Sequence, residues 1–432
     1  MNSKKIAVLR ALALTFLLGL IIFATSAVAA AATLTVGNAS SLPCTGTYST
    51  ISAAVAAALP GDTIQVCPGT YNELVQVNKT LTILGAQSGV DARTRAVPVT
   101  SESVVSNGDG DFQILADKVV IDGFTIQGVV NPANLPPFTG LDAGIWTNPG
   151  FSGTSGGHQI RNNIIQNNIV GIYLNNDGTF ATHVDHNLIQ NNNSPGPAGG
   201  TGIYSDLGLG NATIAANKFV GNTVESAIDV FGGSSITVSN NEFAANRRAI
   251  GWGGVTTATI SGNNIHNSTD LATADIRFFG GVSGVAITCN NLSNGAGRGI
   301  RMDDECPGCP NSSININNNN ISGYPVAGLE VDSGGYFPAT LGSLNATNNW
   351  WGSSTGPTIA SNPGGTGEPI IDPDGVVNYT PFRTTLSSCA PVPQIGPPTN
   401  KDQCKNGGWQ TFNTPRTFKN QGDCIQYVNT GK

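Results

Sequence analysis

Residues 160–165 read IRNNII and residues 260–265 read ISGNNI, so both follow the pattern apolar-x-x-Asn-x-apolar. Seven of eight regularly recurring asparagines lie in this pattern, and their successive separations are 24, 30, 24, 22, 27, 29 and 30 residues. A constant frame with a variable period is typical of a parallel β-helix, in which each repeat is one coil and the loops vary in length. The eight asparagines are Asn163, Asn187, Asn217, Asn241, Asn263, Asn290, Asn319 and Asn349.

These asparagines suit a turn inside the coil. Asparagine tolerates left-handed backbone conformation, and its amide both donates and accepts hydrogen bonds. We therefore expect one asparagine in a turn of each coil and an internal ladder that runs through all of them. Asn-rich sequence can also be disordered, but β-branched or aromatic residues flank each asparagine at matching offsets, which favours the ladder.

The N-terminus has the organisation of a secretory signal peptide. Basic residues Lys4, Lys5 and Arg10 precede an apolar stretch that leads to Ala27-Val28-Ala29. We expect residues 1–29 to be removed and the mature protein to be secreted, extracellular or displayed on the cell surface.

The amino-acid composition argues against nucleic acid as a partner and favours carbohydrate. A charged fraction of 11% and a net charge of −7 give no reason to expect nucleic acid as a partner. No later segment reads as a transmembrane helix, and we expect a monomer. Low charge with abundant Asn, Thr, Ser and Gly suits contact with a polysaccharide or a cell-surface glycan.

The segment before the repeats predicts a cap. Apolar residues between positions 51 and 59 recur at helical spacing, and the turn Pro60-Gly61-Asp62 separates them from a first strand over residues 63–67. We expect residues 30–62 to form an N-terminal segment with an amphipathic helix that covers the open end of a β-helix over residues 63–385. A disulfide between Cys44 and Cys67 would tie this cap to the first coil.

The C-terminal residues differ in composition. Residues 386–400 are Pro-rich and predict a stiff linker. Residues 401–432 are too few to bury a useful core, so we expect a small module closed by a disulfide between Cys404 and Cys424. The pairing of Cys289, Cys306, Cys309 and Cys389 is left open, and we expect a structural disulfide either within Cys306-Pro307-Gly308-Cys309 or from that motif to Cys289.

Several segments resemble a known superfamily. Residues 60–64 (PGDTI), 68–71 (PGTY), Glu73 and 81–85 (LTILG) resemble the N-terminal coils of right-handed parallel β-helix proteins of the pectate-lyase-like superfamily. The repeats, and the ending NNWWG at 348–352, resemble the NosD-type and other secreted bacterial β-helix repeat proteins. The resemblance covers about residues 45–385. It implies an all-β fold, a single-stranded right-handed parallel β-helix of the pectin-lyase-like type, and it does not specify an activity.

A second apolar position marks another strand in each coil and identifies the residues that face outward. These anchors are Ile145, Ile172, Ile203, Ile228, Ile250, Ile276, Ile300 and Leu329. Because side chains alternate along a strand, the residue after each anchor points out: Trp146, Tyr173, Tyr204, Asp229, Gly251, Arg277, Arg301 and Glu330. Two residues further lies a second outward column: Asn148, Asn175, Asp206, Phe231, Gly253, Phe279, Asp303 and Asp332.

The upper part of this face predicts carbohydrate contact. Trp146, Tyr173 and Tyr204 form a strip of aromatic side chains that could stack on sugar rings. Asp206 and Asp229 lie on adjacent coils, about 7 Å apart by sheet geometry. They could act as the acid and base of an inverting glycoside hydrolase, although ordinary exposed aspartates would have the same pattern.

The lower part holds charged residues. Arg277, Arg301, Asp303 and Glu330 could serve a lyase that acts on an acidic polysaccharide, and Asp303 with Asp332 are candidate Ca²⁺ ligands. The same alternation of arginine and acid is what a surface salt-bridge ladder has. No other cofactor is indicated.

Two functions remain open after these observations. The catalytic motifs of polygalacturonases and pectate lyases are missing, which favours a secreted or surface β-helix protein that binds carbohydrate or has a structural role. The alternative is a polysaccharide lyase or glycoside hydrolase that acts on uronate-containing glycan through the outward residues of the strand column 145–332.

Overall fold

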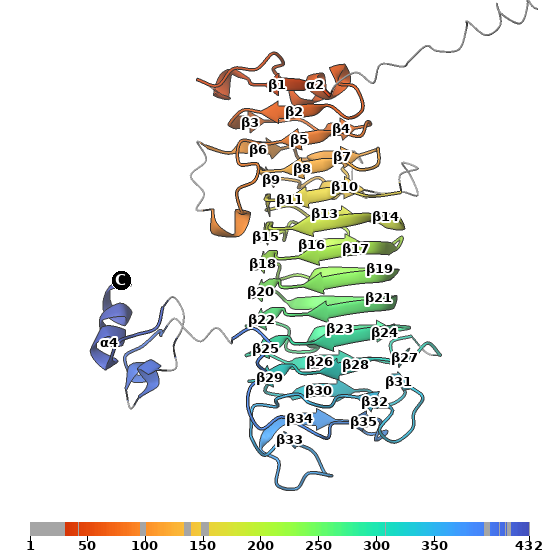
Figure 1. Ribbon diagram of the computed structural model, residues 1–432, viewed down its shortest axis with the longest axis vertical. Helices are drawn as coiled ribbons and strands as arrows, with labels where there is room; N and C mark the ends of the chain where they lie inside the picture. The colour runs from red at the N-terminus through yellow and green to blue at the C-terminus, as the bar shows by residue number, and fades with distance from the viewer. Residues whose placement is uncertain are drawn as a thin grey trace, which may run out of the picture.

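The structure is a computed structural model that describes residues 31–41, 43–95, 101–133, 140–147, 155–306, 308–392, 398–405, 407–410, 412 and 416–431. The expected signal peptide and Asn148 lie outside these residues. The chain winds into a rod of stacked coils in which the registered strand pairs are parallel (Figure 1). The strands stack into three columns, which we call the first, second and third faces.

The first face carries the anchor positions. Its strands are β4 (Val75–Val77), β7 (Phe112–Ile114), β10 (Ala143–Thr147), β13 (Val170–Leu174), β16 (Thr201–Ser205), the beginnings of β19 (Ser226–Ser239) and β21 (Arg248–Ser261), β23 (Ala274–Gly280), β26 (Arg298–Met302), β30 (Ala327–Val331) and β34 (Gly367–Ile371).

The second face is a separate sheet of ten short strands. They are β3 (Gly69–Tyr71), β6 (Ser103–Ser106), β9 (Phe124–Gln127), β12 (Ile164–Gln166), β15 (Leu188–Gln190), β18 (Lys218–Val220), β20 (Glu242–Ala244), β22 (Asn264–His266), β25 (Asn291–Ser293) and β29 (Asn320–Ser322).

The third face joins the first through the long strands β19 and β21. It contains β1 (Thr33–Val36), β2 (Thr63–Val66), β5 (Thr82–Leu84), β8 (Val120–Asp122), β11 (Gln159–Arg161), β14 (Asn176–Asp185), β17 (Leu209–Ala215), the ends of β19 and β21, β24 (Ser283–Thr288), β28 (Asn315–Asn317), β32 (Leu344–Asn345) and β35 (Val377–Asn378). Loop strands β27 (Asn311–Ser312), β31 (Tyr336–Phe337) and β33 (Pro357–Thr358) complete the set. Inward-facing aliphatic and aromatic side chains of all three faces form one continuous core.

The N-terminal cap contains the expected helix, α2 (Ile51–Ala57), which buries Ile51, Ala54 and Val55. Its N-terminus is held by the Glu73 carboxylate, which accepts hydrogen bonds from the backbone amides of Ile51 and Ser52 at 2.8 and 2.9 Å. Negative charge at a helix N-terminus is stabilising, which gives Glu73 a structural role. The expectation that the strand at residues 63–67 comes first was wrong, because β1 precedes the helix and pairs with β2.

The asparagine ladder is present, and all eight asparagines are buried. In a typical rung, Asn217 Nδ2 donates hydrogen bonds to Asn241 Oδ1 at 3.1 Å and to the carbonyl of Val184 at 2.8 Å. Phe124 occupies the same turn position one coil before Asn163, and its backbone amide donates to Asn163 Oδ1 at 3.0 Å. The ladder therefore satisfies buried polar groups from coil to coil.

One physical reason given for the ladder asparagines was wrong. In the described residues, left-handed backbone is adopted by the residue before each ladder asparagine, with φ between 54° and 64°. These residues are Asn162, His186, Ala216, Asn240, Gly262, Cys289, Asn318 and Asn348. The sharp bend of the turn falls one residue earlier, so the ladder position needs asparagine for its amide alone.

A second, shorter ladder follows the first by five residues. Asn168, Asn192, Asn222 and Asn246 are buried, and Nδ2 of each of the first three donates to Oδ1 of the next at 3.0 to 3.3 Å. The same position in the next three coils is held by Ser268, Gly295 and Tyr324. This ladder had a signal in the sequence, since its separations repeat those of the first ladder.

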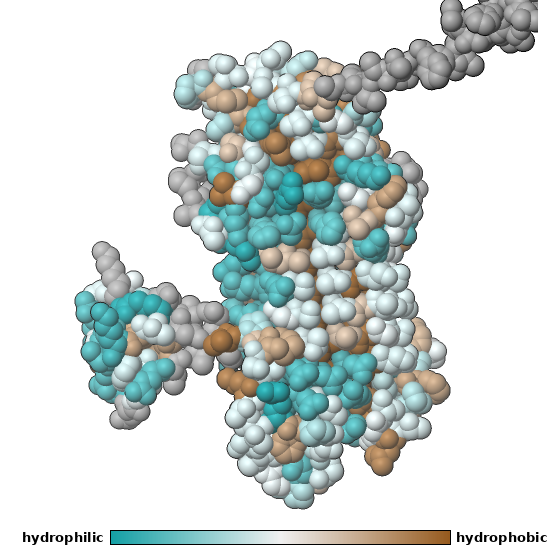
Figure 2. Space-filling model, in the orientation of Figure 1, coloured by the Kyte–Doolittle hydropathy of each residue, from teal (hydrophilic) through white to brown (hydrophobic). Residues whose placement is uncertain are grey.

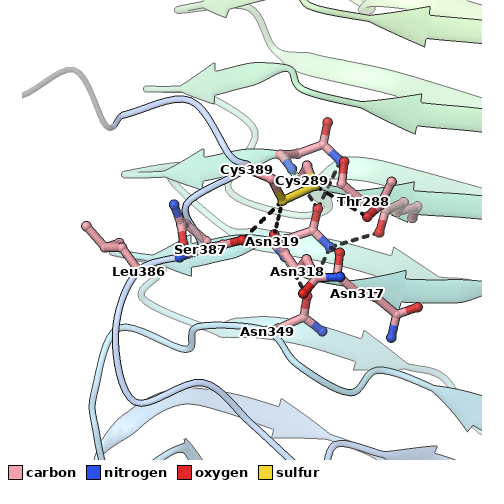
Figure 3. The surroundings of a disulfide bond; sticks show 12 residues. Thr288, Cys289, Asn317, Asn318, Asn319, Asn349, Leu386, Ser387 and Cys389 are labelled. Carbon is pink, nitrogen blue, oxygen red and sulfur yellow. Dashed lines mark hydrogen bonds between the residues drawn. A yellow bond between two sulfur atoms is a disulfide. The ribbon is translucent and has the colours of Figure 1, made fainter.

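A strap of residues 381–389 runs back along the last ladder turns. The amide of Arg383 donates to the carbonyl of Asn349 at 2.9 Å, and the amide of Ser387 donates to Asn320 Oδ1 at 2.7 Å. A disulfide between Cys289 and Cys389 fixes the strap to an earlier coil (Figure 3). Cys306 therefore pairs with Cys309, and the alternative bond from that motif to Cys289 was wrong.

Beyond the strap lies the small C-terminal module, drawn beside the rod in Figure 1. It contains the short 3-10 helices η4 (Asp402–Cys404) and η5 (Gly408–Gln410) and the helix α4 (Gln421–Thr430). The expected disulfide Cys404–Cys424 is buried with Phe412 and Phe418 in a core of its own. The expected disulfide Cys44–Cys67 is also present. None of the helices in the described part of the chain is long and apolar enough to cross a membrane.

Candidate functional site

The register of the first face follows the sequence prediction. Every anchor from Ile145 to Leu329 has 0% exposure, so the anchors point inward. The residues that follow them pair across neighbouring strands: Trp146 with Tyr173, Tyr173 with Tyr204, Tyr204 with Asp229, Asp229 with Gly251, Gly251 with Arg277, Arg277 with Arg301, and Arg301 with Glu330. The structure therefore brings the candidate residues onto one face.

Five aromatic side chains form a continuous line on this face, which we call the aromatic strip. The ring centroids of Trp146 and Tyr173 are 6.3 Å apart, and those of Tyr173 and Tyr204 are 5.5 Å apart. The line continues to Phe231 at 6.1 Å and then to Phe279 at 5.6 Å. Phe231 and Phe279 come from the second outward column, and sequence reasoning did not include them among the carbohydrate contacts.

Tyr173 also contacts the candidate acid Asp206. Its hydroxyl donates a hydrogen bond to Asp206 Oδ1 at 2.6 Å. Burial and the neighbouring Asp206 carboxylate raise the pKa of Tyr173, so the phenol stays protonated and remains a donor. Asp206 itself is exposed, and this hydrogen bond orients the Tyr173 ring within the aromatic strip.

Next to the strip is a hollow that we call the Asp229 pocket, with a volume of about 440 Å³. Its lining residues are Glu225, Asp229, Phe231, Arg247, Arg248, Arg277, Phe279, Glu305 and Cys306. Gly251 makes the space possible: a Cβ atom there would lie 2.1 Å from Asp229 Oδ1 and 3.1 Å from Phe279 Cζ. The Asp229 carboxyl therefore leans over a glycine on the next coil.

Asp229 differs from the exposed aspartate that the strand pattern predicts. It is in the outward register but only 4% exposed, because neighbouring side chains cover it. Burial raises the pKa of Asp229 to about 6, although Arg248, the nearby Ser226 hydroxyl and Arg247 lower it, and Glu225 raises it further. Among the described residues, neither Asp229 Oδ1 nor the neighbouring Ser226 Oγ has a hydrogen-bond partner within bonding geometry. A buried carboxyl with a free oxygen beside a pocket is a candidate ligand contact.

The arginines of the pocket are all paired. Arg248 lies 2.6 Å from Glu225 and 3.8 Å from Asp270, and Arg247 lies 3.4 and 3.2 Å from the same two carboxylates. Arg277 pairs with Asp303 and Glu305, and its guanidinium also lies over the Phe279 ring. Arg247, Arg248 and Glu225 were missed by sequence reasoning, because they precede the anchors Ile228 and Ile250, and outward residues were counted only after each anchor.

The lower part of the face is an ion-pair network. Arg301 contacts Asp303 at 2.7 Å, Asp332 at 2.9 Å and Glu330 at 3.5 Å. Asp303 and Glu330, expected to be exposed, are 1% and 7% exposed. The candidate Ca²⁺ ligands Asp303 and Asp332 are therefore already paired with arginine guanidinium groups, which bind carboxylates strongly. Within the described ranges, no group of three or more His, Cys, Asp or Glu side chains is arranged to hold a metal ion.

The aromatic strip has apolar side chains beneath it. Figure 2 shows a narrow lengthwise stripe of hydrophobic surface on the visible side of the rod, with smaller hydrophobic patches elsewhere on that side. Beneath the aromatic strip, Val129, Ala143, Ile169 and Val170 form a small buried cluster against which Trp146, Tyr173 and Tyr204 pack. The aromatic rings are therefore supported from below.

Comparisons with known proteins found one matching family model and several similar solved structures. Residues 150–362 match the family model described as right handed beta helix region. An alginate lyase from Paenibacillus sp. str. FPU-7 is 15% identical, with a TM-score of 0.47 over 73% of this chain and 99% of that one. The pectate lyase Pel9A is 14% identical, with a TM-score of 0.43 over 83% and 90%.

A third solved structure, PfbA, described as a surface adhesin of Streptococcus pneumoniae, is 10% identical, with a TM-score of 0.41 over 63% of this chain and 80% of that one. No curated protein sequence matches the chain at a significant level. The strands pair in parallel from coil to coil, so the described residues form a parallel β-helix, and residues 150–362 match the family model of a right-handed one.

Proposed function

We propose that this is an exported protein that binds a polysaccharide along its first face. The aromatic strip carries this proposal. Its rings are partly exposed, and Phe231 is 42% exposed. Aromatic faces stack on the apolar faces of sugar rings, while the Tyr hydroxyls and nearby carboxylates offer hydrogen bonds to sugar hydroxyls.

The direction and length of the strip suit a chain-like ligand. It crosses six adjacent coils, which is roughly 24 Å at about 4.8 Å per coil. A monosaccharide would occupy a small part of this length, so the ligand is an oligosaccharide or a polysaccharide segment that lies parallel to the rod axis.

Export is supported by cysteine usage and the N-terminal sequence. The structure contains four disulfides and no free cysteine among the described residues. Disulfides form and persist in oxidising compartments, which agrees with the signal peptide expected at residues 1–29. A glycan of the cell surface or of the surroundings is then an accessible ligand.

A second function, cleavage of the bound glycan, is favoured by one observation. Asp229 is a buried carboxyl whose pKa of about 6 allows it to hold a proton near neutral pH, as a general acid in glycoside hydrolysis must. The aromatic strip supports binding without specifying cleavage, so binding is the first proposal.

The test is a panel of pectins, alginates and neutral glycans, incubated with the protein with and without Ca²⁺. Binding is read by calorimetry, and cleavage by reducing ends and unsaturated product. We expect binding that Tyr173→Ala and Tyr204→Ala each weaken by about tenfold or more, which is a loss of about 1.4 kcal/mol. Phe337→Ala, at an exposed aromatic residue outside the strip, is the matched control.

The possible results separate the two functions. If no glycan binds, or if the strip variants bind as tightly as the wild type, the binding proposal is wrong. Release of reducing ends or unsaturated product that Asp229→Asn abolishes would establish cleavage as the function of this face.

A further inference from the structure

The Asp229 pocket contains two buried polar atoms that lack a hydrogen-bond partner among the described residues. They are Asp229 Oδ1 and Arg248 Nε, and the two residues are 4% and 3% exposed. Arg248 Nε lies 3.8 Å from Asp270, which is too far for a hydrogen bond. Buried polar groups are nearly always paired in folded proteins, so a ligand with its own polar groups would complete this pocket.

The two atoms call for a group that can both donate and accept. Arg248 Nε carries a hydrogen and can only donate, whereas an ionised Asp229 can only accept. A sugar hydroxyl can accept the first hydrogen bond and donate the second. A uronate carboxylate can accept from Arg248 but has no proton to give to Asp229.

The charges around the pocket also disfavour a uronate. Each lining arginine is already within ion-pair distance of two carboxylates: Arg247 and Arg248 of Glu225 and Asp270, and Arg277 of Asp303 and Glu305. Three guanidinium groups therefore face five carboxylates when Asp229 is included. A bound anion would find no unpaired guanidinium group to pair with, and it would lie near carboxylates of the same charge.

The walls of the pocket fit the body of a sugar ring. Phe231 and Phe279 are stacked with an interplanar angle of 7°, and both line the pocket. Their rings are the end of the aromatic strip, so a glycan that runs along the strip reaches Asp229 and Arg248 without leaving the face.

We propose that the Asp229 pocket is a specificity subsite that holds one neutral sugar residue of the bound glycan between Asp229 and Arg248 and discriminates against a uronate. This inference rests on the proposed glycan binding and names the class of sugar at one subsite. It also separates this site from a lyase site, which needs cations free to bind the uronate carboxylate.

The test compares sugars that differ only in the carboxyl group. Oligogalacturonates, oligomannuronates and oligoglucuronates are each measured beside their carboxyl-reduced counterparts, by calorimetry at pH 8 with the full chain. We expect the reduced member of a pair to bind more tightly by at least about tenfold. Asp229→Asn removes the negative charge with little change of shape, so it should bring the affinities of the two members together.

A pair of glycine variants tests the geometry. Gly251→Ala would place a Cβ atom 2.1 Å from Asp229 Oδ1 and displace that carboxyl, so it should weaken binding of the reduced member. Gly253→Ala is the matched control, because a Cβ atom there would lie 3.5 Å from Phe231, an ordinary contact distance. It should keep the preference between paired members.

The possible failures are distinguishable. If oligosaccharides bind and Tyr204→Ala weakens them, but the uronate member binds as tightly as the reduced one, the inference is wrong and the proposed function stands. An unchanged preference in Asp229→Asn also overturns the inference. If no member of any pair binds, both the inference and the proposed function are wrong.

Discussion

Asp275 is the single ionisable residue in a column of glycines and alanines. The residue before each anchor is Gly144, Gly171, Gly202, Ala227, Ala249, Asp275, Gly299 or Gly328. Asp275 is 2% exposed, and its Oδ2 accepts a hydrogen bond from the Tyr324 hydroxyl at 2.5 Å. Gly295 makes room for this contact, since a Cβ atom there would lie 2.6 Å from Tyr324 Cε1 and 2.8 Å from Asp275 Oδ1.

This pair predicts a pH dependence of stability. Burial raises the pKa of Asp275 to about 7, although the hydrogen bond from Tyr324 lowers it, whereas an aspartate in an unfolded chain has a pKa of about 3.9. The folded state therefore binds more protons between these values, and the contribution of Asp275 to stability falls as pH rises from about 4 to 7. The slope approaches about 1.4 kcal/mol per pH unit within this window.

The measurement is the free energy of unfolding of the wild type and of Asp275→Asn from pH 4 to 9. We expect the wild-type value minus the variant value to decline through the window and to level off above about pH 7. Asp304→Asn removes the same charge at an exposed aspartate, so it is the control for the change of net charge. A difference that is flat or that rises with pH would contradict the assignment.

Individual residues show how far sequence reasoning reaches. The ladder asparagines and the anchors predicted which side chains point outward, because a strand alternates and each coil repeats the frame. Burial of Asp229, Asp303 and Glu330 was not predictable, since it depends on long arginine side chains and on a glycine in the next coil. The pairing of Asp275 with Tyr324 joins residues 49 positions apart, with one coil between them.

At the scale of elements, the strap is the part of the fold that the sequence did not show. Its residues belong to the expected linker and to the chain just before it. The Pro-rich composition of the linker predicts a stiff segment and gives no sign that it contacts the rod. Cys389 reaches Cys289 across 100 residues of sequence, next to a ladder turn (Figure 3). The rod itself was predictable because its contacts repeat, whereas the strap makes each of its contacts once.

The Cys289–Cys389 disulfide should contribute strongly to stability. A bond that closes a loop of about 100 residues restricts the unfolded chain by about 4 to 5 kcal/mol in the loop-entropy model. We expect Cys389→Ser to lower the free energy of unfolding by several times more than Cys309→Ser, which opens a disulfide between residues three positions apart. Denaturant unfolding under non-reducing conditions measures both.

Equal losses in the two cysteine variants would show that the strap is held by its hydrogen bonds rather than by the covalent bond. Hydrogen exchange at the amide of Ser387, which donates to Asn320 Oδ1, reports whether the strap has opened. We expect this amide to exchange faster in Cys389→Ser and at the wild-type rate in Cys309→Ser.

At the scale of the whole molecule, the rod and the C-terminal module have separate means of stability. The rod buries one continuous hydrophobic core that runs through its coils. The module has a small core around Cys404, Phe412, Phe418 and Cys424. A core of this size needs its disulfide, so loss of the Cys404–Cys424 bond should unfold the module at temperatures where the rod remains folded.

Ending the chain after residue 397 should therefore leave the rod unchanged. We expect its unfolding temperature to stay within about 1 °C of the wild-type value, which for a rod of this length corresponds to a change of less than about 1 kcal/mol. Binding of the glycan that the aromatic strip recognises should also be unchanged, since the strip is formed by coils of the first face alone. Cys404→Ser in the full chain, which opens the module without removing it, should give the same two values. A drop of several degrees or a weaker affinity in the shortened chain would instead mean that the module packs against the rod and contributes to its binding face.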